Sequence, residues 1–488
     1  MQHEQPIAAG ETVPPFADVP LFVDVDGTLA RADISLESFV RIARSGVTNL
    51  LRLILWLLRG RAVAKTMAAR RDPLDPATLP LRAEVLDLIA QAKAEGRQVM
   101  LASASHWRNI RRLAHHLDLR DPIIASRGRA NLKGRAKLAA IRERIGPDRS
   151  FDYVGDSGAD ICLWREARQG WSVRHIPRGS QVRRIGPARP GWRPVLVRAM
   201  RIHQWAKNAL VLVPVLTAGQ FLHPRPLLTA VAAALLMSLI ASSIYLVNDL
   251  LDIDSDRAHR TKCERPLAHG DLSIPAALGL SALLGTIGLV GGWLLGGAHL
   301  TLCLLAYMAI TTAYSFRLKA VMVGDAIVLA SLYTIRIWIG GVASGVPLSF
   351  WLLLFSMFLF LSLAYLKRYV EMRDATEPGR LLSGRGYVGG DLDVVMMSGV
   401  SSGMVAILVL ALFAHDPATT AHYRTPELLW LLCLPLIYWM NRIWMMARRG
   451  QVEGDPVAFA IRDRRSILIG AAMAAIFLSA LHGPVAMG

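Results

Sequence analysis

The chain has 488 residues, 53% of them hydrophobic, and a formal net charge of +18. This composition is too apolar for a wholly soluble protein, and the length leaves room for two or three domains. The apolar runs lie mainly after about residue 207, which predicts a soluble N-terminal part and a membrane-embedded remainder. In a membrane protein, positive charge first indicates cytoplasmic loops and anionic lipid headgroups, so we expect no nucleic-acid partner.

The four cysteines, Cys162, Cys263, Cys303 and Cys433, are scattered and form neither a CxxC motif nor the spacing of a zinc site. They indicate a reducing compartment and no structural metal. The first 16 residues lack an apolar core, so a signal peptide is not expected.

Three apolar stretches in the first 165 residues end in polar side chains. The first ends in Asp24 and Asp26, the second in Ser103, and the third in Asp156 and Asp160. Segments with helical patterning separate them, and alternating strands and helices predict a parallel sheet with its chemistry at the carboxyl ends of the strands.

These motifs, in this order, resemble the signatures of the haloacid dehalogenase (HAD) phosphatase superfamily. The resemblance implies an α/β HAD-like domain over residues 1–180, with a Rossmannoid parallel sheet and a helical cap at about 34–75. It implies that Asp24 is the nucleophile and that Asp26 acts as general acid and then base. Ser103 would bind the transferring phosphoryl group.

The same resemblance implies a lysine that neutralises the phosphoryl charge, and a Mg²⁺ site. Lys137 is our choice for the lysine, and Lys133 remains the alternative. The metal ligands would be Asp24, Asp156 and Asp160. A HAD-like domain that has lost its activity is the other interpretation.

Within the expected cap, Leu50–Leu58 is strongly apolar but far short of the ~20 residues that span a bilayer. Two interpretations stay open. The segment contacts the membrane surface or the membrane domain, or it is a buried core helix.

Residues 181–200 are rich in Arg, Pro and Gly and predict a basic linker along an anionic surface. The remainder, 201–488, is predicted to be an all-α polytopic bundle of nine transmembrane helices. The nine apolar segments lie near 208–224, 226–247, 273–295, 297–314, 323–341, 350–366, 394–413, 427–441 and 466–484.

Basic residues predict the orientation of these segments. The loops after the second, fourth, sixth and eighth segments contain 17 Lys and Arg, whereas the alternate loops contain 2. Positive loops face the cytoplasm, so the soluble head is predicted to be cytoplasmic and the C-terminus outside. We expect a bacterial inner (cytoplasmic) membrane.

An acidic segment follows the second apolar run. If the helix continues, Asn248, Asp252 and Asp256 lie on one face, with Asp249 about 100° to one side. Clustered carboxylates suit Mg²⁺, which shares its shell with substrate phosphates. A solvated charged loop is the alternative. The basic residues that follow could bind outer phosphate oxygens; they are Arg257, Arg260, Lys262 and Arg265.

Further polar residues are predicted on the same side of the membrane. They are Lys207, Tyr314, Lys319, Asp325, Arg336 and Lys367, with Glu453, Asp455, Arg462, Asp463 and Arg464 in the last inner loop. Arg336 lies eleven residues after Asp325, about three turns along the same face. An arginine at that depth is costly and needs an anion or a carboxylate partner. Together these groups predict a diphosphate site.

The motif NDxxDxxxD at 248–256, together with YSxxLK at 314–319, resembles the UbiA superfamily of intramembrane prenyltransferases. The resemblance implies a bundle of nine helices and a diphosphate donor held by Mg²⁺. The second motif of that family is usually DxxxD, but here Leu329 stands where the second aspartate is expected after Asp325. This departure argues against an ordinary user of prenyl diphosphate.

Other segments are similar to one branch, the decaprenyl-phosphate phosphoribosyltransferases. They are RIHQWAKN at 201–208, DSDRAHRTKCERP at 254–266, YTIRIWIGG at 333–341, LKRYVEM at 366–372 and GDPVAFAIRDR at 454–464. In that branch the donor is phosphoribosyl pyrophosphate and the acceptor is a polyprenyl phosphate. The HAD-like domain would then remove the 5-phosphate from the lipid product.

The resemblance implies roles for individual residues. Asp249, Asp252 and Asp256 would hold Mg²⁺, and Asp249, Asp252 and Lys319 would be catalytic. The expected substrate-binding residues are Lys207, Asn248, Arg257, Lys262, Arg265, Tyr314, Arg336 and Lys367. One alternative is transfer of a polyprenyl group from its diphosphate to an aromatic or other small acceptor; another is a transporter or scaffold with a degenerate head. The sequence leaves the oligomeric state open.

Overall fold

The computed structural model describes residues 18–128, 132–174, 176, 181–187, 190–374, 385–416, 423–452 and 454–482. Three parts of the sequence considered above lie outside this described part. They are the first 16 residues, in which no signal peptide is expected, residues 188–189 of the predicted linker, and Glu453. The chain forms two compact units. The first comprises residues 1–199 and 246–280, and the second comprises 200–245 and 281–488. The acidic segment therefore groups with the first unit.

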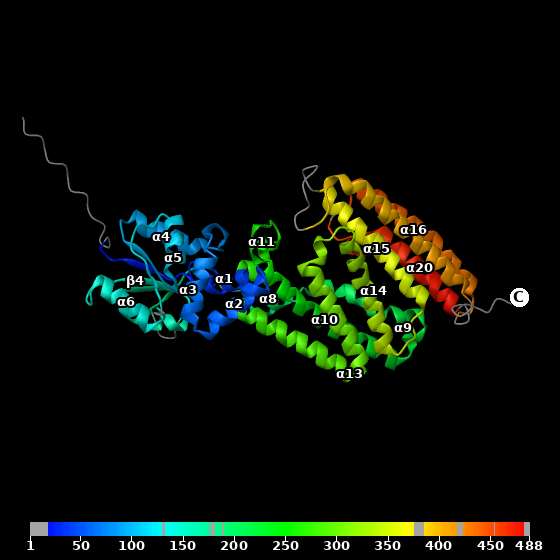
Figure 1. Cartoon of the computed structure of the whole chain (residues 1–488), viewed down its shortest axis with the longest axis horizontal. Coiled ribbons are helices and arrows are strands. Elements are labelled where there is room, and N and C mark those ends of the chain that lie inside the picture. The colour runs from blue at the N-terminus through cyan, green and yellow to red at the C-terminus, as the bar shows by residue number, and fades with distance from the viewer. Residues whose placement is uncertain are drawn as a thin grey trace, which may run out of the picture. The chain divides into compact units, whose positions relative to one another are not determined.

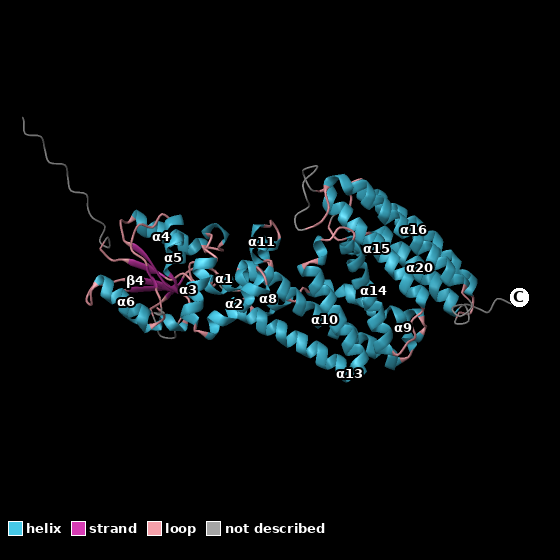
Figure 2. Cartoon of the chain, viewed as in Figure 1, coloured by secondary structure: helices cyan, strands magenta, loops and turns pink. Residues whose placement is uncertain are grey.

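A six-stranded sheet with the order β3-β2-β1-β4-β5-β6 forms the centre of the first unit (Figure 2). The strands are β1 Leu21–Val23, β2 Val99–His106, β3 Ile124–Ser126, β4 Asp152–Gly155, β5 Gln169–Ser172 and β6 Arg183–Arg184. All neighbours pair in parallel, and Val23 of β1 is in register with Leu101 of β2 and Val154 of β4. The predicted parallel sheet is confirmed, and the ends of three strands meet at one edge.

Helices connect the strands, as a parallel sheet requires. They are α4 Ala83–Ala94, α5 Trp107–His116, α6 Arg135–Ile145 and α7 Ile161–Glu166. Helices α4 and α5 pack on a core that includes Leu21, Val23 and Leu101, whereas α6 and α7 pack on a second core that includes Phe22 and Met100.

Three helices follow β1 and occupy most of the range expected for the cap. They are α1 Ile34–Arg44, α2 Val47–Leu58 and α3 Arg61–Arg71. Only Leu53 of α2 is buried, and seven of its apolar side chains are exposed. The interpretation of α2 as a buried core helix is therefore wrong.

The rest of the described chain is almost entirely helical. The first unit also contains α8 Trp192–Ala199, α11 Ile253–Ala258 and α12 Pro266–His269. The helices α10 Pro224–Leu251 and α13 Ile274–Phe316 have residues in both units. The second unit contains α14 Gly324–Ser344, α15 Phe350–Arg373, α16 Leu392–His415, α18 Cys433–Arg448, α19 Pro456–Arg462 and α20 Arg464–His482. Helix α15 packs between α14 and α16 (Figure 1).

The prediction of nine transmembrane helices is confirmed only in part, because seven helices among the described residues are long and apolar enough to cross a membrane. One of them, α13, has 43 residues, but Gly296 and Gly297 have non-helical backbone angles. The predicted segments 273–295 and 297–314 therefore lie on either side of this break. A straight helix of that length would measure about 65 Å, roughly twice the thickness of the hydrocarbon core.

The first predicted segment, 208–224, does not form one long helix. It contains parts of the 3₁₀ helix η3 Ile202–Leu212, the short helix α9 Val213–Thr217 and the 3₁₀ turn η4 Gln220–Leu222. Gly219 separates the last two in the left-handed conformation, with φ of 67°. A non-helical residue at that point ends the helix, however apolar the surrounding sequence is.

Gly340 of α14 lies against the backbone of η3, and a Cβ atom there would lie 2.0 Å from the carbonyl oxygen of Val211. We expect Gly340→Ala to destabilise the second unit by about 1–3 kcal/mol or more, because neither backbone moves away easily. Gly470→Ala on α20 is the matched control, since no heavy atom lies within 4 Å of its added Cβ. Thermal unfolding in detergent, followed by tryptophan fluorescence, should give a lower Tm for the first variant only. Equal values of Tm would contradict this packing.

Candidate active sites

Asp24 follows β1 and is buried beside a lysine. The Nζ atom of Lys137 lies 2.7 Å from Oδ1 of Asp24 and 3.1 Å from the hydroxyl of Tyr153. Lys137 belongs to α6, which precedes β4. Of the two lysines left open by the sequence, Lys137 is the one that contacts the predicted nucleophile.

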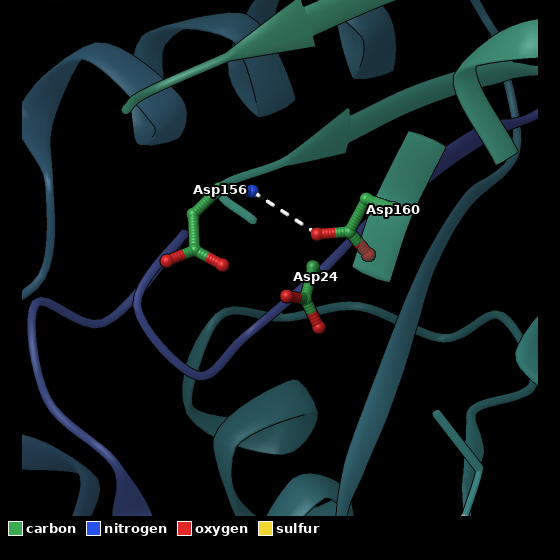
Figure 3. A group of neighbouring side chains, drawn as sticks. All are labelled: Asp24, Asp156 and Asp160. Atoms are coloured by element: carbon green, nitrogen blue, oxygen red, sulfur yellow. Dashed lines mark hydrogen bonds between the residues drawn. The ribbon is translucent and has the colours of Figure 1, made fainter. Parts of the chain in front are cut away.

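Asp24, Asp156 and Asp160 come together in space (Figure 3). One ligand oxygen from each lies within 4.8 Å of the others, and all three residues are buried. Among the described residues, this is the one group of three or more possible metal ligands that meets this distance. The predicted triad therefore has the spacing and the oxygen donors that suit Mg²⁺.

The three carboxylates differ in how their oxygens are used. Asp160 accepts hydrogen bonds from the hydroxyl of Tyr153 (2.8 Å) and from the Ser157 hydroxyl (2.9 Å) and backbone NH (3.1 Å). Asp156 contacts Arg174 at 3.2 Å. Because the oxygens of Asp160 are largely engaged, Asp24 and Asp156 are better placed as direct ligands, with Asp160 supporting the loop.

Asp26 lies beside Ser103, which is inside β2 and not at its end as predicted, because the strand continues past a register shift to His106. The hydroxyl of Ser103 donates a hydrogen bond to its Oδ2 at 2.8 Å, and the backbone NH of Ile34 donates one to Oδ1 at 3.0 Å. Ser103 also accepts a hydrogen bond from the backbone NH of Ser105. The structure thus brings together all four signatures that the sequence predicted from separate stretches.

Gly27 makes the turn between Asp26 and the rest of this loop possible. Its φ is 82°, and an added Cβ would lie 2.5 Å from Oδ2 of Asp156. Only glycine leaves this space open at low conformational cost.

Charge in this site is incompletely balanced. Burial raises the pKa of Asp24 to about 7, although Lys137 acts in the opposite direction. Burial also raises the pKa of Asp156, against the lowering effect of Arg174. A divalent cation would offset the cost of holding these groups ionised, so the residues fit a Mg²⁺ site.

Two residues of this site were missed in the sequence. Tyr153 lies inside β4 and would be read as a core residue of an apolar strand, although its hydroxyl joins Lys137 to Asp160. Arg174 follows β5 and contacts Asp156 across adjacent strands. Its place just after a strand of a parallel sheet is the signal that could have identified it.

The acidic segment, also in the first unit, is nearly the continuous helix that the sequence predicted. Helix α10 ends at Leu251 and α11 begins at Ile253, with Asp252 between them. The backbone NH of Asp252 still bonds to Asn248, and that of Asp256 to Asp252. The side chains of Asp249 and Asp256 are buried, and both contact Nη1 of Arg265, at 3.2 and 2.6 Å. Two carboxylates therefore point at one cationic position.

The other residues of this segment that were predicted to bind substrate or metal do not join Asp249, Asp256 and Arg265. Arg257 forms a two-pronged ion pair with Glu37 of α1, at 2.5 and 2.9 Å, and donates to the carbonyl of Ala268. Lys262 is exposed, and Asn248 and Asp252 are half-buried. Asp252 is not part of a metal-competent group in the described residues. The structure thus groups Asp249, Asp256 and Arg265, and directs Arg257 toward the cap helix.

In the second unit, Lys207 and Lys367 meet at one carboxylate. Their Nζ atoms lie 2.8 and 3.6 Å from Oδ2 of Asp455. Burial by itself would raise the pKa of Asp455, but the two lysines hold it at about 2. Two cations for one carboxylate leave positive charge that suits a phosphate.

Arg336 is buried in α14, as predicted, but its hydrogen-bond partners are neutral. Its Nε donates to Oδ1 of Asn208 at 3.0 Å, Nη2 to the hydroxyl of Tyr307 at 3.2 Å, and Nη1 to the carbonyl of Leu332. The expected anion or carboxylate partner is absent from its contacts with the described residues. Hydrogen bonds and the faces of Tyr307 and Tyr333 replace it.

Asp325 is fully buried and paired. Nε of Arg368 lies 2.5 Å from its Oδ2, and the hydroxyl of Tyr387 donates to its Oδ1 at 2.6 Å. Arg368 also pairs with Glu371 and donates to the hydroxyl of Tyr314 at 3.0 Å. Asp325 is thus part of an ion-pair network, and Tyr314 joins that network. Lys319 lies nearby in sequence, in the 3₁₀ turn η6 Leu318–Ala320.

Comparison with known proteins matches two successive parts of the sequence to two families. Residues 209–485 match the UbiA prenyltransferase family. The chain belongs to this family. Residues 21–165 match the haloacid dehalogenase-like hydrolases, so both resemblances recognised in the sequence are confirmed.

Three relatives illustrate how far the similarity extends. The uncharacterized protein y4nM of Sinorhizobium fredii is 35% identical over 95% of this chain and 91% of its own length. Nodulation protein NoeC of Azorhizobium caulinodans is 33% identical over 57% of this chain and 92% of its own length. Decaprenyl-phosphate phosphoribosyltransferase of Mycolicibacterium smegmatis is 34% identical over 55% of this chain and 86% of its own length. The first of these spans both parts of this UbiA-family protein.

The raised pKa values of Asp24 and Asp156 predict how Mg²⁺ binding to the HAD-like domain depends on pH. Below a pKa of about 7, a proton occupies Asp24 and must leave before the metal binds. We expect the dissociation constant for Mg²⁺ to fall by up to about tenfold per pH unit toward pH 7, and then to level off. Isothermal titration calorimetry on the full chain measures it.

Asp156→Asn is the control for that measurement, because it removes one proposed ligand while the acidic segment stays intact. The pH-dependent binding should disappear in this variant. Affinity that is the same at acid and neutral pH would contradict a metal site at these buried carboxylates.

Proposed function

We propose that this UbiA-family protein transfers phosphoribose from phosphoribosyl pyrophosphate to a polyprenyl phosphate, with Mg²⁺, and that its HAD-like domain removes the 5-phosphate from the product. The choice of donor rests on one observation: Asp325 is buried and already paired with other side chains. The family's second acidic motif is reduced to this one residue. Arg368 already balances its charge, and Tyr387 donates a hydrogen bond to it. One acidic segment remains for a single pyrophosphate group.

The relatives support the same choice. A protein 34% identical over 55% of this chain is named decaprenyl-phosphate phosphoribosyltransferase. Phosphoribosyl pyrophosphate carries a 5-phosphate besides its pyrophosphate, so its site needs additional cations. Lys207 and Lys367, which share Asp455, supply such a position.

In the proposed transfer, a phosphate oxygen of the lipid attacks C1 of the ribose, the C1–O bond breaks, and pyrophosphate leaves. No protein base is required, because the attacking oxygen is already an anion. Mg²⁺ would be held by Asp249, Asp252 and Asp256, together with Asn248. When bound, it would neutralise charge on the pyrophosphate. Arg265, Lys262 and Lys319 would bind the negative charge that develops on the leaving group.

The remaining cations bind the reactants. Lys207 and Lys367 would hold the phosphate of the lipid or the sugar 5-phosphate, and Tyr314 would position Arg368. Arg336 donates a hydrogen bond to Asn208, the residue that follows Lys207, and would shape this position. Orientation of the two phosphates and electrostatic stabilisation would supply most of the rate.

In the HAD-like domain, Oδ of Asp24 would attack the phosphorus of the 5-phosphate, and Asp26 would protonate the departing ribose oxygen. Asp26 then takes a proton from the water that hydrolyses the aspartyl-phosphate. Lys137 and Ser103 would stabilise the charge on the transferring phosphoryl group. The contacts of Lys137 with Asp24 and of Ser103 with Asp26 support these roles.

We further propose that the protein lies in the bacterial inner membrane, with the HAD-like domain cytoplasmic and the C-terminus outside. The uneven distribution of Lys and Arg between alternate loops supports this orientation. Both proposed sites would then face the cytoplasm, where we expect the water-soluble donor phosphoribosyl pyrophosphate.

Asp252→Ala should lower the transfer of phosphoribose by at least about 100-fold, the order of a lost electrostatic contact to the reacting group. Asp254→Ala is the matched control, because Asp254 pairs with Arg41 of the cap and has no proposed part in the transfer. Purified protein, polyprenyl phosphate and labelled phosphoribosyl pyrophosphate give the rate as labelled lipid. Labelled prenyl diphosphate in a parallel assay tests the alternative donor, and its use instead would overturn the proposal.

Asp24→Asn should leave the transfer intact but stop removal of the 5-phosphate, so phosphoribosyl lipid accumulates. Asp26→Asn should slow the same step by about 10²–10⁴-fold, the usual contribution of general acid–base catalysis. Asp118→Asn, on an exposed loop, serves as control. Mass spectrometry of the lipid separates the two products. Ribosyl lipid without phosphate from Asp24→Asn protein would mean that the HAD-like domain does not catalyse this step.

A further inference from the structure

Helix α2 of the cap presents an uncovered apolar face. Five apolar residues recur at the spacing of one helix face, and each is at least 44% exposed. They are Val47, Leu51, Ile54, Leu55 and Leu58. Leu58 and Val47, at its two ends, are 79% and 73% exposed. Leu50 and Leu57 extend this face to one side. We call these seven residues the α2 face.

The opposite side of α2 is apolar too, and it is already packed. Leu53 is buried against Ile42 of α1 and Ala68 of α3, and Trp56 packs against the same small core. Helix α2 is therefore apolar nearly all round, which is typical of helices that are covered on every side. A continuous exposed apolar face of this kind indicates a binding surface for a protein or a membrane.

The charges around the α2 face favour a membrane. Between Ser38 and Arg71 the sequence has eight Lys or Arg and no Asp or Glu. Arg44, Arg59 and Arg61 are exposed just beyond the two ends of α2, and Arg52 is exposed within it. An apolar face bordered by arginines matches the boundary between acyl chains and anionic headgroups.

We propose that α2 lies in the interface of the bilayer, parallel to its plane, and holds the HAD-like domain against an anionic lipid surface. With 12 residues it is about 18 Å long, too short to cross the hydrocarbon core. The described part of the same chain has seven helices able to span the membrane, so the cap is tethered covalently to a membrane-embedded segment. Attachment raises the effective concentration of lipid, and a short helix is then sufficient. The proposal requires membrane attachment but neither proposed reaction.

Depth measurements on the full chain in nanodiscs of phosphatidylcholine and phosphatidylglycerol test this placement. A nitroxide is attached at Leu51→Cys or Leu55→Cys after the native cysteines Cys162, Cys263, Cys303 and Cys433 are replaced. We expect both labels to be accessible to oxygen, which enters the acyl region, and shielded from a water-soluble nickel chelate. Asp118→Cys, on an exposed loop of the same domain, is the control and should show the opposite pattern.

Two results would overturn the proposal. Labels at both α2 positions that the nickel chelate reaches freely would mean that the face remains in water. Labels that are immobile and shielded from both reagents, in detergent as well as in nanodiscs, would mean that protein covers it.

A second variant separates lipid binding from folding. Leu51→Glu with Leu55→Glu changes only exposed side chains, so the melting temperature of the HAD-like domain should not change. A nitroxide at Leu58→Cys should lose its oxygen accessibility in this background and become accessible to the nickel chelate. Unchanged oxygen accessibility at this position would contradict insertion of the α2 face.

Discussion

A buried carboxylate is stable only if positive charge or hydrogen bonds compensate it, and this constraint organises each polar site of the protein. The balance differs from site to site. Asp325 and Glu371 face Arg368 and Arg385, so their charges cancel within the second unit. A network of this kind needs no ligand, and this explains how an acidic residue of a substrate motif becomes part of the scaffold.

The other sites lack this balance, and the sign of the excess charge indicates the ligand. Asp24, Asp156 and Asp160 meet Lys137 and Arg174, which leaves excess negative charge for a divalent cation. Asp455 meets two lysines, which leaves excess positive charge for a phosphate. The proposed phosphoryl chemistry with Mg²⁺ would use both kinds of site.

The cap helix α1 contacts two polar regions within the first unit. Its first residue, Ile34, donates a backbone hydrogen bond to Asp26 of the phosphatase-like site. Further along, Glu37 pairs with Arg257, and Arg41 pairs with Asp254, both next to the acidic segment. One helix of 11 residues therefore contacts both the HAD-like site and the segment proposed to bind pyrophosphate. This arrangement gives the fusion of the two domains a structural basis besides their order in the chain.

The sequence by itself determined the features that depend on local pattern: the parallel sheet with Asp24 and Asp156 at its strand ends, the apolar helices, and the near-continuous helix through Asp252. Each follows from the spacing of residues close together in the chain. Only the tertiary structure decided which residues meet from distant segments. It selected Lys137 over Lys133, added Tyr153 and Arg174, gave Arg336 neutral partners, and exposed the α2 face. The physical reason is that side-chain pairing and burial depend on how separate helices and strands pack, which local periodicity does not encode.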